Sequence, residues 1–233
     1  MKALRIALLS LFSATALLAA DAVGWETLFD GTSAPAAALS TAKWRGYRQT
    51  GFPAKGWVVE GGALKVQAGG GGGDLVTRDT YGSFELLWEW KVSEGANSGL
   101  IYHASEEFGA SYETGLEYQL LDDAKHGDGK NPKTSAGALY ALIAPNQDKQ
   151  LRPVGEWNKS RLVIYGSHVQ HWLNGKLIVQ YDLASPELKA LIAQSKFKDM
   201  PKFAQVADGH ICLQDHGNDV WFRYIRVKRL EVK

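Results

Sequence analysis

Two polar side chains, Glu117 and Gln119, stand two residues apart in the middle of the chain. Their run, Glu-Tyr-Gln-Leu-Leu, has the composition of a β-strand, and a strand directs residues i and i+2 to the same face. A carboxylate and a carboxamide would therefore point together from one sheet surface. A carboxylate can serve as a general base, and a carboxamide can orient a polar ligand. A hydrophobic core would not select this pair, so we expect the strand to border a binding cleft.

Other polar side chains recur at the same spacing in distant parts of the sequence. Gln214 and His216 form one such pair, and Glu156 and Asn158 form another. A β-sandwich can bring these rows together on its concave face, where a polar groove with aromatic walls suits a sugar. Each tryptophan is more often a core residue in a β protein. The candidate stacking residues are Trp157, Trp172, Trp221, Tyr118 and Tyr140.

The segment after Gln119 is acidic and contains a histidine. Asp122, His126 and Asp128 combine carboxylate and imidazole groups, which are ligands for a divalent metal. A solvated acidic loop explains the same residues, so a metal stays one of two interpretations. No other cofactor is indicated.

Short strands must position these side chains. Residues 83–92 alternate apolar and polar, as in a half-buried strand, and Asn174-Gly175 between two alternating runs predicts a hairpin. One helix is expected over 185–195, with Ser185 as its N-cap and Pro186 at its first position. About a dozen short strands and no βαβ alternation predict an all-β fold. We expect one domain over 21–233, a β-sandwich of two antiparallel sheets.

Five consecutive glycines, residues 69–73, superficially suggest a phosphate-binding loop. No Lys-Ser or Lys-Thr follows them and they open no helical pattern, which argues against a nucleotide site. The sequence favours a flexible hairpin tip.

The composition and the amino-terminal residues limit the classes of protein that are possible. Twenty-six basic residues balance 25 acidic ones, so no basic field predicts a nucleic-acid partner. Residues 1–20 have the layout of a secretory signal peptide and predict a periplasmic or secreted protein, without a membrane span after cleavage, although a retained anchor is the alternative. Cys212 is the single cysteine, so no internal disulfide is expected. No protein partner is indicated.

Eight short motifs together resemble one known family. In chain order they are N-S-G-L at 97–100, E-Y-Q-L-L-D at 117–122, A-G-A-L-Y at 136–140, G-E-W-N at 155–158, H-W-L-N-G at 171–175, S-K-F at 195–197, G-H-I-C-L-Q-D-H-G at 209–217 and W-F-R-Y-I at 221–225. The set resembles the bacterial 3-keto-disaccharide hydrolase family over about residues 25–232. Tyr224 is a departure, because the family pattern has Asn after the arginine.

The resemblance implies a concanavalin A-like jelly-roll sandwich in an exported enzyme that acts on glycosides or disaccharides oxidised at C3. A C3 ketone acidifies the C2 proton, so a base can remove it and the C1 substituent can leave by elimination, after which water adds. The implied base, or a metal ligand, is Glu117 or Asp122, and His216 is the proton donor or enolate partner. Further implied substrate contacts are Asn97, Gln119, Gln214, Glu156 and Trp157, with Lys196 or Arg223 as the positive charge.

Two other functions remain open at this stage. A conventional glycosidase on the same fold needs two carboxyl groups, and Gln119, two residues after Glu117, cannot ionise. That reading is disfavoured. A noncatalytic carbohydrate-binding domain would use the same groove and tryptophans.

Overall fold

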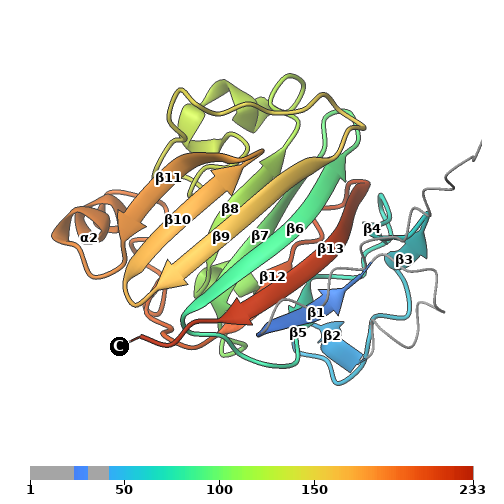
Figure 1. The fold of residues 1–233 in the computed structure, drawn as a ribbon, viewed down its shortest axis with the longest axis horizontal. Helices are drawn as coiled ribbons and strands as arrows, with labels where there is room; N and C mark the ends of the chain where they lie inside the picture. The colour runs from blue at the N-terminus through green and yellow to red at the C-terminus, as the bar shows by residue number, and fades with distance from the viewer. Residues whose placement is uncertain (1–23, 31–41, 233) are drawn as a thin grey trace, which may run out of the picture.

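A computed structural model describes residues 24–30 and 42–232, so the predicted signal peptide lies outside the described residues. Its strands form two antiparallel sheets that pack face to face (Figure 1). The larger sheet has the order β11-β10-β9-β6-β13-β4-β3, with β1 also paired to β13, and the smaller has the order β2-β5-β12-β7-β8. The strands are β1 (Trp25–Phe29), β2 (Trp44–Gly46), β3 (Trp57–Glu60), β4 (Ala63–Val66), β5 (Leu75–Thr77), β6 (Phe84–Val92), β7 (Asn97–Ala104), β8 (Leu116–Leu121), β9 (Asn158–Tyr165), β10 (His168–Leu173), β11 (Lys176–Asp182), β12 (His210–Leu213) and β13 (Val220–Arg229).

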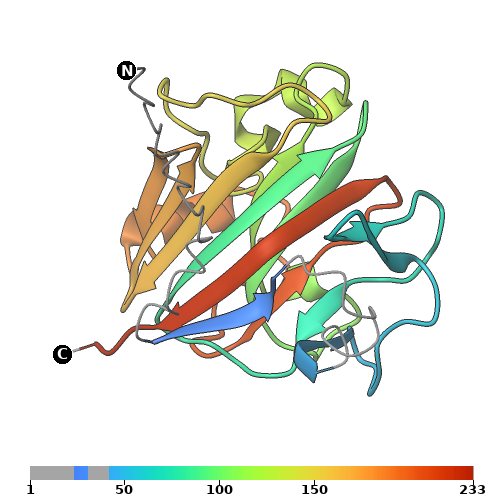
Figure 2. The same cartoon turned by 45° about the vertical axis from the view of Figure 1, so that its right-hand side comes forward.

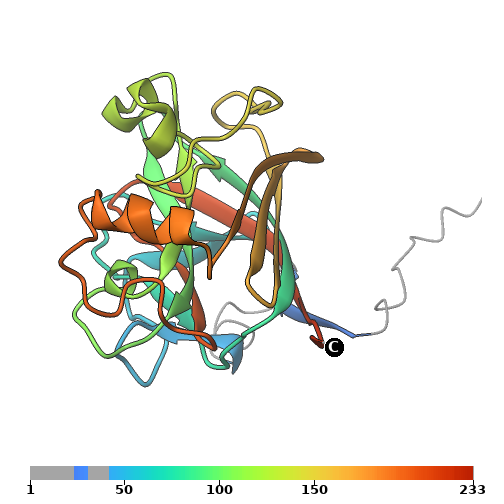
Figure 3. The same ribbon diagram turned by 90° about the vertical axis from the view of Figure 1, so that its left-hand side faces the viewer.

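Short helical segments lie between several of the strands. The α-helix α2 (Pro186–Ala193) begins where expected, because the Ser185 hydroxyl accepts a hydrogen bond from the Leu188 amide at 3.1 Å. In side view α2 lies beside the five-stranded sheet (Figure 3). The three 3₁₀ segments are η1 (Ser111–Glu113), η2 (Gly127–Lys130) and η3 (Pro132–Thr134). In the described ranges no helix is long and apolar enough to cross a membrane.

The core lies between the two sheets. On β6 the alternation predicted from the sequence buries Phe84, Leu86, Trp88 and Trp90, each at most 1% exposed. The Trp88 ring meets Tyr118 of β8 edge to face, with their centroids 5.0 Å apart. Burial of these rings drives the sheets together and leaves alternate residues of each strand pointing outward. The prediction of an all-β two-sheet sandwich is confirmed.

The long strand β13 runs between β6 and β1 (Figure 2). Its pairing with β6 shifts register between Arg223 and Arg226, which marks a β-bulge. Within the bulge, Tyr224 has a φ of 51° and is 48% exposed. Asparagine tolerates this left-handed conformation far better than tyrosine does. The departure from the family pattern therefore falls at a strained position.

We expect Tyr224→Asn to raise the free energy of unfolding by about 0.5–1 kcal/mol, because it relieves the left-handed backbone. The lost contact between the Tyr224 ring and Arg223, 5.0 Å apart, offsets part of the gain. Urea unfolding measures the difference. Tyr224→Phe keeps both the ring and the strain and should match the wild type, whereas a less stable Tyr224→Asn protein would contradict the argument.

The glycine run of residues 69–73 is not a hairpin tip, which corrects the expectation from the sequence. It connects β4 in the larger sheet to β5 in the smaller one and so carries the chain between the two layers. A Cβ added to Gly72 would lie 2.5 Å from the Lys55 carbonyl oxygen and 2.9 Å from the Trp57 ring. Close packing against this neighbouring segment, rather than flexibility, explains the glycine there.

Candidate active site

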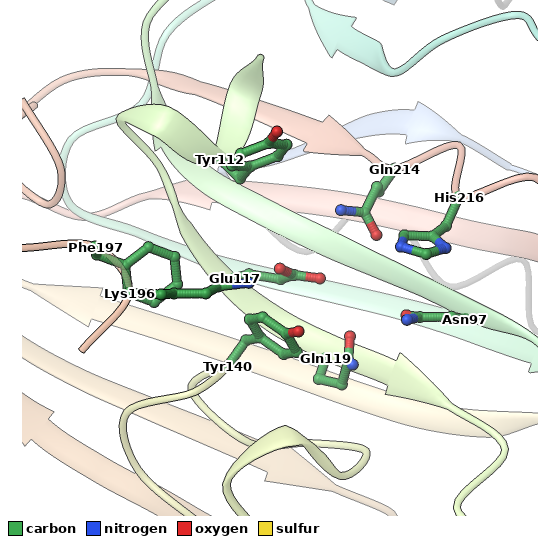
Figure 4. Close-up of a pocket in the computed structure, with 9 residues that line it drawn as sticks. All are labelled: Asn97, Tyr112, Glu117, Gln119, Tyr140, Lys196, Phe197, Gln214 and His216. Carbon is green, nitrogen blue, oxygen red and sulfur yellow. The ribbon is translucent and has the colours of Figure 1, made fainter. Parts of the chain in front are cut away.

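A pocket of about 260 Å³ opens on the outer face of the five-stranded sheet (Figure 4). Its walls come from β7, β8, η1, the segment after η3, the segment after α2 and the loop between β12 and β13. The lining residues are Asn97, Tyr112, Glu117, Gln119, Tyr140, Lys196, Phe197, Gln214 and His216. The polar rows that the sequence places 97 residues apart, beginning at Glu117 and at Gln214, therefore share one cavity.

Strand alternation places Glu117 and Gln119 in this pocket. Tyr118, between them, points inward and packs on Trp88, so its neighbours point outward. Gly99 of β7 lies opposite Gln119. A Cβ at Gly99 would lie only 2.2 Å from Oε1 of Glu117, so the missing side chain creates the space that the carboxyl group occupies.

Glu117 is buried, and only 9% of the residue is exposed. Burial raises its pKa to about 8; the Lys196 ammonium acts in the opposite direction, and the Asp74 and Asp128 carboxylates add to the rise. At a pKa near 8 the group can both accept and return a proton close to neutral pH. Such a perturbed carboxyl group in a pocket is typical of a general base.

Three carboxamide oxygens around this group have no hydrogen-bond partner among the described residues. They are Asn97 Oδ1, Gln119 Oε1 and Gln214 Oε1, and all three are buried. The amide nitrogen of Gln119 donates to the Thr134 carbonyl at 3.1 Å, which assigns its orientation and leaves its oxygen free. Buried acceptors without donors are rare in folded proteins. A ligand with several hydroxyl groups would satisfy them.

Lys196 and His216 supply donor groups at the pocket. The Lys196 ammonium lies 4.3 Å from the centre of the Tyr140 ring and acts electrostatically on Glu117. His216 is exposed and, within the described ranges, its imidazole makes no hydrogen bond. Both can therefore turn toward a bound molecule.

Asp122, a candidate base from the sequence, does not line this pocket. Its carboxylate accepts hydrogen bonds from the amides of Gly95 at 2.8 Å and Ala124 at 3.0 Å. Short acidic side chains often hold the backbone in this way just past a strand end. The structure therefore corrects the expectation for Asp122 and leaves Glu117 as the carboxyl group of the site.

Trp157 and Arg223 lie on the opposite side of the molecule, which corrects a second expectation. Arg223 pairs with Glu89 at 2.7 Å and stacks on Trp157 at 3.9 Å, on the outer face of the eight-stranded sheet. Glu156 is exposed in the turn before β9, outside the pocket lining. Neither Trp157 nor Arg223 lines the pocket, so neither supplies the implied stacking surface or positive charge there.

The candidate metal ligands Asp122, His126 and Asp128 serve other contacts. His126 Nδ1 accepts a hydrogen bond from the Asp128 amide at 3.1 Å, and Asp128 accepts one from the Tyr140 hydroxyl at 3.4 Å. Across residues 24–30 and 42–232, no three His, Cys, Asp or Glu side chains are gathered as a metal site requires. The three candidate ligands therefore form no such site in this part of the chain.

Sequence reasoning missed two lining residues. Tyr112, 44% exposed at the pocket mouth, lies in the short segment η1, which has no periodic signal. Phe197 was visible only as the last residue of the S-K-F motif. Its burial comes from stacking on Phe203, with the ring centroids 4.0 Å apart.

The sandwich fold, the polar pocket and the similar proteins described next identify the protein as a carbohydrate-cleaving enzyme, a glycoside hydrolase. The chain belongs to the family of 3-keto-alpha-glucoside-1,2-lyase-like domains, whose model matches residues 24–228. A 3-keto-disaccharide hydrolase of Bacteroides thetaiotaomicron is 35% identical over 244 residues, which cover 92% of this chain and 81% of that protein. The family resemblance predicted from the motifs is thus confirmed.

Solved structures support the same assignment. A crystal structure from Parabacteroides distasonis, described as a glycosyl hydrolase, superposes with a TM-score of 0.78 at 32% identity, covering 89% of this chain and 94% of that one. The endo-beta-1,3(4)-glucanase SCLam has a TM-score of 0.53 at 12% identity, covering 91% and 94%. The glucanase shares the fold alone. The predicted jelly-roll architecture is confirmed.

Proposed function

We propose that this protein cleaves the glycosidic bond of glycosides oxidised at C3, 3-keto-disaccharides among them, by elimination followed by addition of water. The observation that carries the proposal is one buried carboxyl group, Glu117, surrounded by three unpartnered carboxamide oxygens. The hydroxyl groups of a sugar ring would donate to those oxygens and hold its C2–H against the carboxylate.

In the first half of the reaction Glu117 removes the C2 proton of the 3-keto sugar. The electron pair of the C2–H bond delocalises onto the C3 oxygen as an enolate, which the Lys196 ammonium stabilises. The pair then forms a C1–C2 double bond as the C1–O bond breaks. The leaving oxygen takes a proton from His216.

In the second half water adds across the C1–C2 double bond, with its hydroxyl group at C1 and a proton at C2. Glu117, protonated in the first half, returns that proton, and His216, which lost its proton to the leaving group, takes the proton that water gives up. The sum is hydrolysis with no change in oxidation state. The same groups thus act twice, and the C3 ketone is required in both halves.

The pocket lining supports elimination over direct displacement at C1. A conventional glycosidase uses two carboxyl groups on either side of the bond. Among the described residues that line the pocket, Glu117 is the one carboxyl group, and its partner two residues on is the amide Gln119. A substrate with an acidified C2–H needs only one such base.

Purified protein should release the aglycone from a 3-keto-glucoside and leave the unoxidised glucoside intact, because only the ketone acidifies C2–H. Chromatography of both reactions measures the release. Release from both substrates would favour the two-carboxylate mechanism instead. Binding of the keto sugar without release would favour a carbohydrate-binding domain.

The proposed site of action is the periplasm or the medium, on the basis of the signal-like sequence of residues 1–20. The mass of the mature protein recovered from the cell envelope tests this placement. Full-length protein in the cytoplasm would contradict it.

A further inference from the structure

We propose that Asp215 is a positioning residue that clamps the loop between β12 and β13 to the glycine run and thereby places His216 at the pocket. The catalytic part of this inference rests on the proposed function. Asp215 lies between two pocket-lining residues, Gln214 and His216, but does not itself line the pocket. Its side chain instead contacts the backbone of the glycine run and of Gly217.

The Asp215 carboxylate accepts three backbone hydrogen bonds. Oδ2 accepts from the amides of Gly72 at 2.9 Å and Gly73 at 3.1 Å, and Oδ1 accepts from the Gly217 amide at 3.0 Å. The clamp therefore joins the residue before His216 to the residue after it, and both to the glycine run. A carboxylate that accepts several amide hydrogen bonds forms strong, directional contacts.

Further contacts hold the same loop in place. The Asp215 amide donates to Oδ1 of Asp74 at 2.9 Å, and the Gly69 amide donates to the Gly217 carbonyl at 3.2 Å. The next residue, Asn218, accepts from the Asn97 amide at 3.1 Å, which links the loop to β7 of the pocket wall. The backbone on both sides of His216 is thus attached to the scaffold.

The clamp explains why this segment is built from glycine. Gly69, Gly71 and Gly73 have φ values of 67°, 59° and 71°, a conformation that other residues adopt only with strain. A Cβ on Gly70 would lie 2.6 Å from Cα of Gly56. The run therefore packs against a second backbone and presents two adjacent amides to Asp215, as other anion-binding backbone turns do.

Gln214 and His216 depend on the clamp to different degrees. Gln214 is also held within the sheet, because its amide donates to the Gly99 carbonyl and its carbonyl accepts from the Ser98 hydroxyl, both at 2.9 Å. The His216 imidazole has no hydrogen bond of its own within the described ranges. Loss of the clamp should therefore displace the proton donor and spare sugar binding.

The test compares Asp215→Ala, Asp215→Asn, His216→Ala and the double variant Asp215→Ala/His216→Ala on a 3-keto-glucoside. We expect Asp215→Ala to lower kcat about 10²-fold with KM within about threefold, as for a misplaced catalytic group. Asp215→Asn keeps one of the two acceptor oxygens and should recover part of the rate. The double variant should be no slower than His216→Ala alone, because both changes remove one function. Asp148→Ala, which removes an exposed carboxylate, is the matched control.

Wild-type kcat in Asp215→Ala, or additive losses in the double variant, would overturn the inference. If Asp215→Ala does not fold, Asp215→Ser, with one acceptor oxygen, replaces it. Amide hydrogen exchange of Gly72, Gly73 and Gly217 tests the clamp without turnover: protection should fall at all three amides in Asp215→Ala, whereas in Asp215→Asn it should persist only where the remaining oxygen accepts. If the wild type cleaves no 3-keto-glycoside, the proposed function fails, while unchanged exchange would still refute the clamp.

Discussion

Glu117→Gln is expected to lower kcat for a 3-keto-glucoside by about 10³-fold or more, because glutamine cannot accept the C2 proton. The amide has nearly the volume of the carboxyl group and keeps its hydrogen-bonding capacity, so sugar binding should persist. Single-turnover and steady-state kinetics separate the lost chemistry from retained binding. The comparison on the same 3-keto substrate isolates the function of the carboxylate.

The pH dependence of the wild type should report the same group. Burial raises the Glu117 pKa to about 8, and only the deprotonated form is a base. We therefore expect the limb of the kcat/KM profile that reports Glu117 to rise about tenfold per pH unit below pH 8 and to level near that value. A stopped assay from about pH 5.5 to about pH 9.5, which brackets that value, measures the profile.

The stability of the wild type should fall as pH rises, whereas its rate should increase. Because folding raises the Glu117 pKa from 4.5 to about 8, its contribution to stability is full below pH 4.5 and is lost as pH rises through 8. Glutamine does not titrate, so above pH 8 the variant should be more stable than the wild type by up to about 5 kcal/mol. Near pH 4.5 the two proteins should unfold alike. Thermal or urea unfolding at both pH values measures the difference.

Two control variants sharpen this result. Glu94→Gln changes an exposed carboxylate and should alter neither rate nor stability. Asp122→Asn weakens the contacts to the Gly95 and Ala124 amides and should reduce stability more than catalysis. Full activity in Glu117→Gln, or a stability difference that does not depend on pH, would remove Glu117 from the mechanism.

Gly99→Ala should reduce kcat by about 10²-fold while the protein stays folded, because displacement of a reacting group by about 1 Å has that effect on rate. The new Cβ would lie 2.2 Å from Oε1 and 2.8 Å from Cδ of Glu117. The side chain of Glu117 can turn away at small cost in stability, but its carboxylate then leaves the position beside C2–H. Kinetics together with thermal unfolding measure both effects.

Gly51→Ala is the matched control, since a Cβ at Gly51 meets no atom within 4 Å. It should leave rate unchanged. Combining Gly99→Ala with Glu117→Gln should cost little more than Glu117→Gln alone, because the carboxylate is already absent. Wild-type kcat in Gly99→Ala would show that the carboxylate position observed here is not the reactive one.

Local pattern was enough to predict most of the framework. The Asn174-Gly175 turn forms a hairpin with φ values of 47° and 83°, and Ser185 caps the helix where expected. The same period-2 rule put Glu117 and Gln119 on one face of β8. These features depend on neighbours within a few residues, which a sequence displays directly.

Position in three dimensions was not predictable for residues whose role depends on a distant partner. Arg223 and Trp157 have the types and spacing of sugar ligands, yet they stack on each other behind the eight-stranded sheet. The glycine run looked like a flexible tip because its partner, Asp215, is more than 140 residues away. No local signal records such pairings.

By itself, the sequence determined that this protein is an all-β sandwich with an outward-facing carboxylate and carboxamide on one strand, because strand alternation and apolar burial act locally. Only the tertiary structure decided that Glu117, Asn97, Gln214 and Lys196 meet in one pocket and that Asp122, Glu156 and Arg223 do not. The tertiary structure also sets the pKa of Glu117. Desolvation comes from every segment that covers the carboxyl group, and those segments become neighbours only when the sheets close.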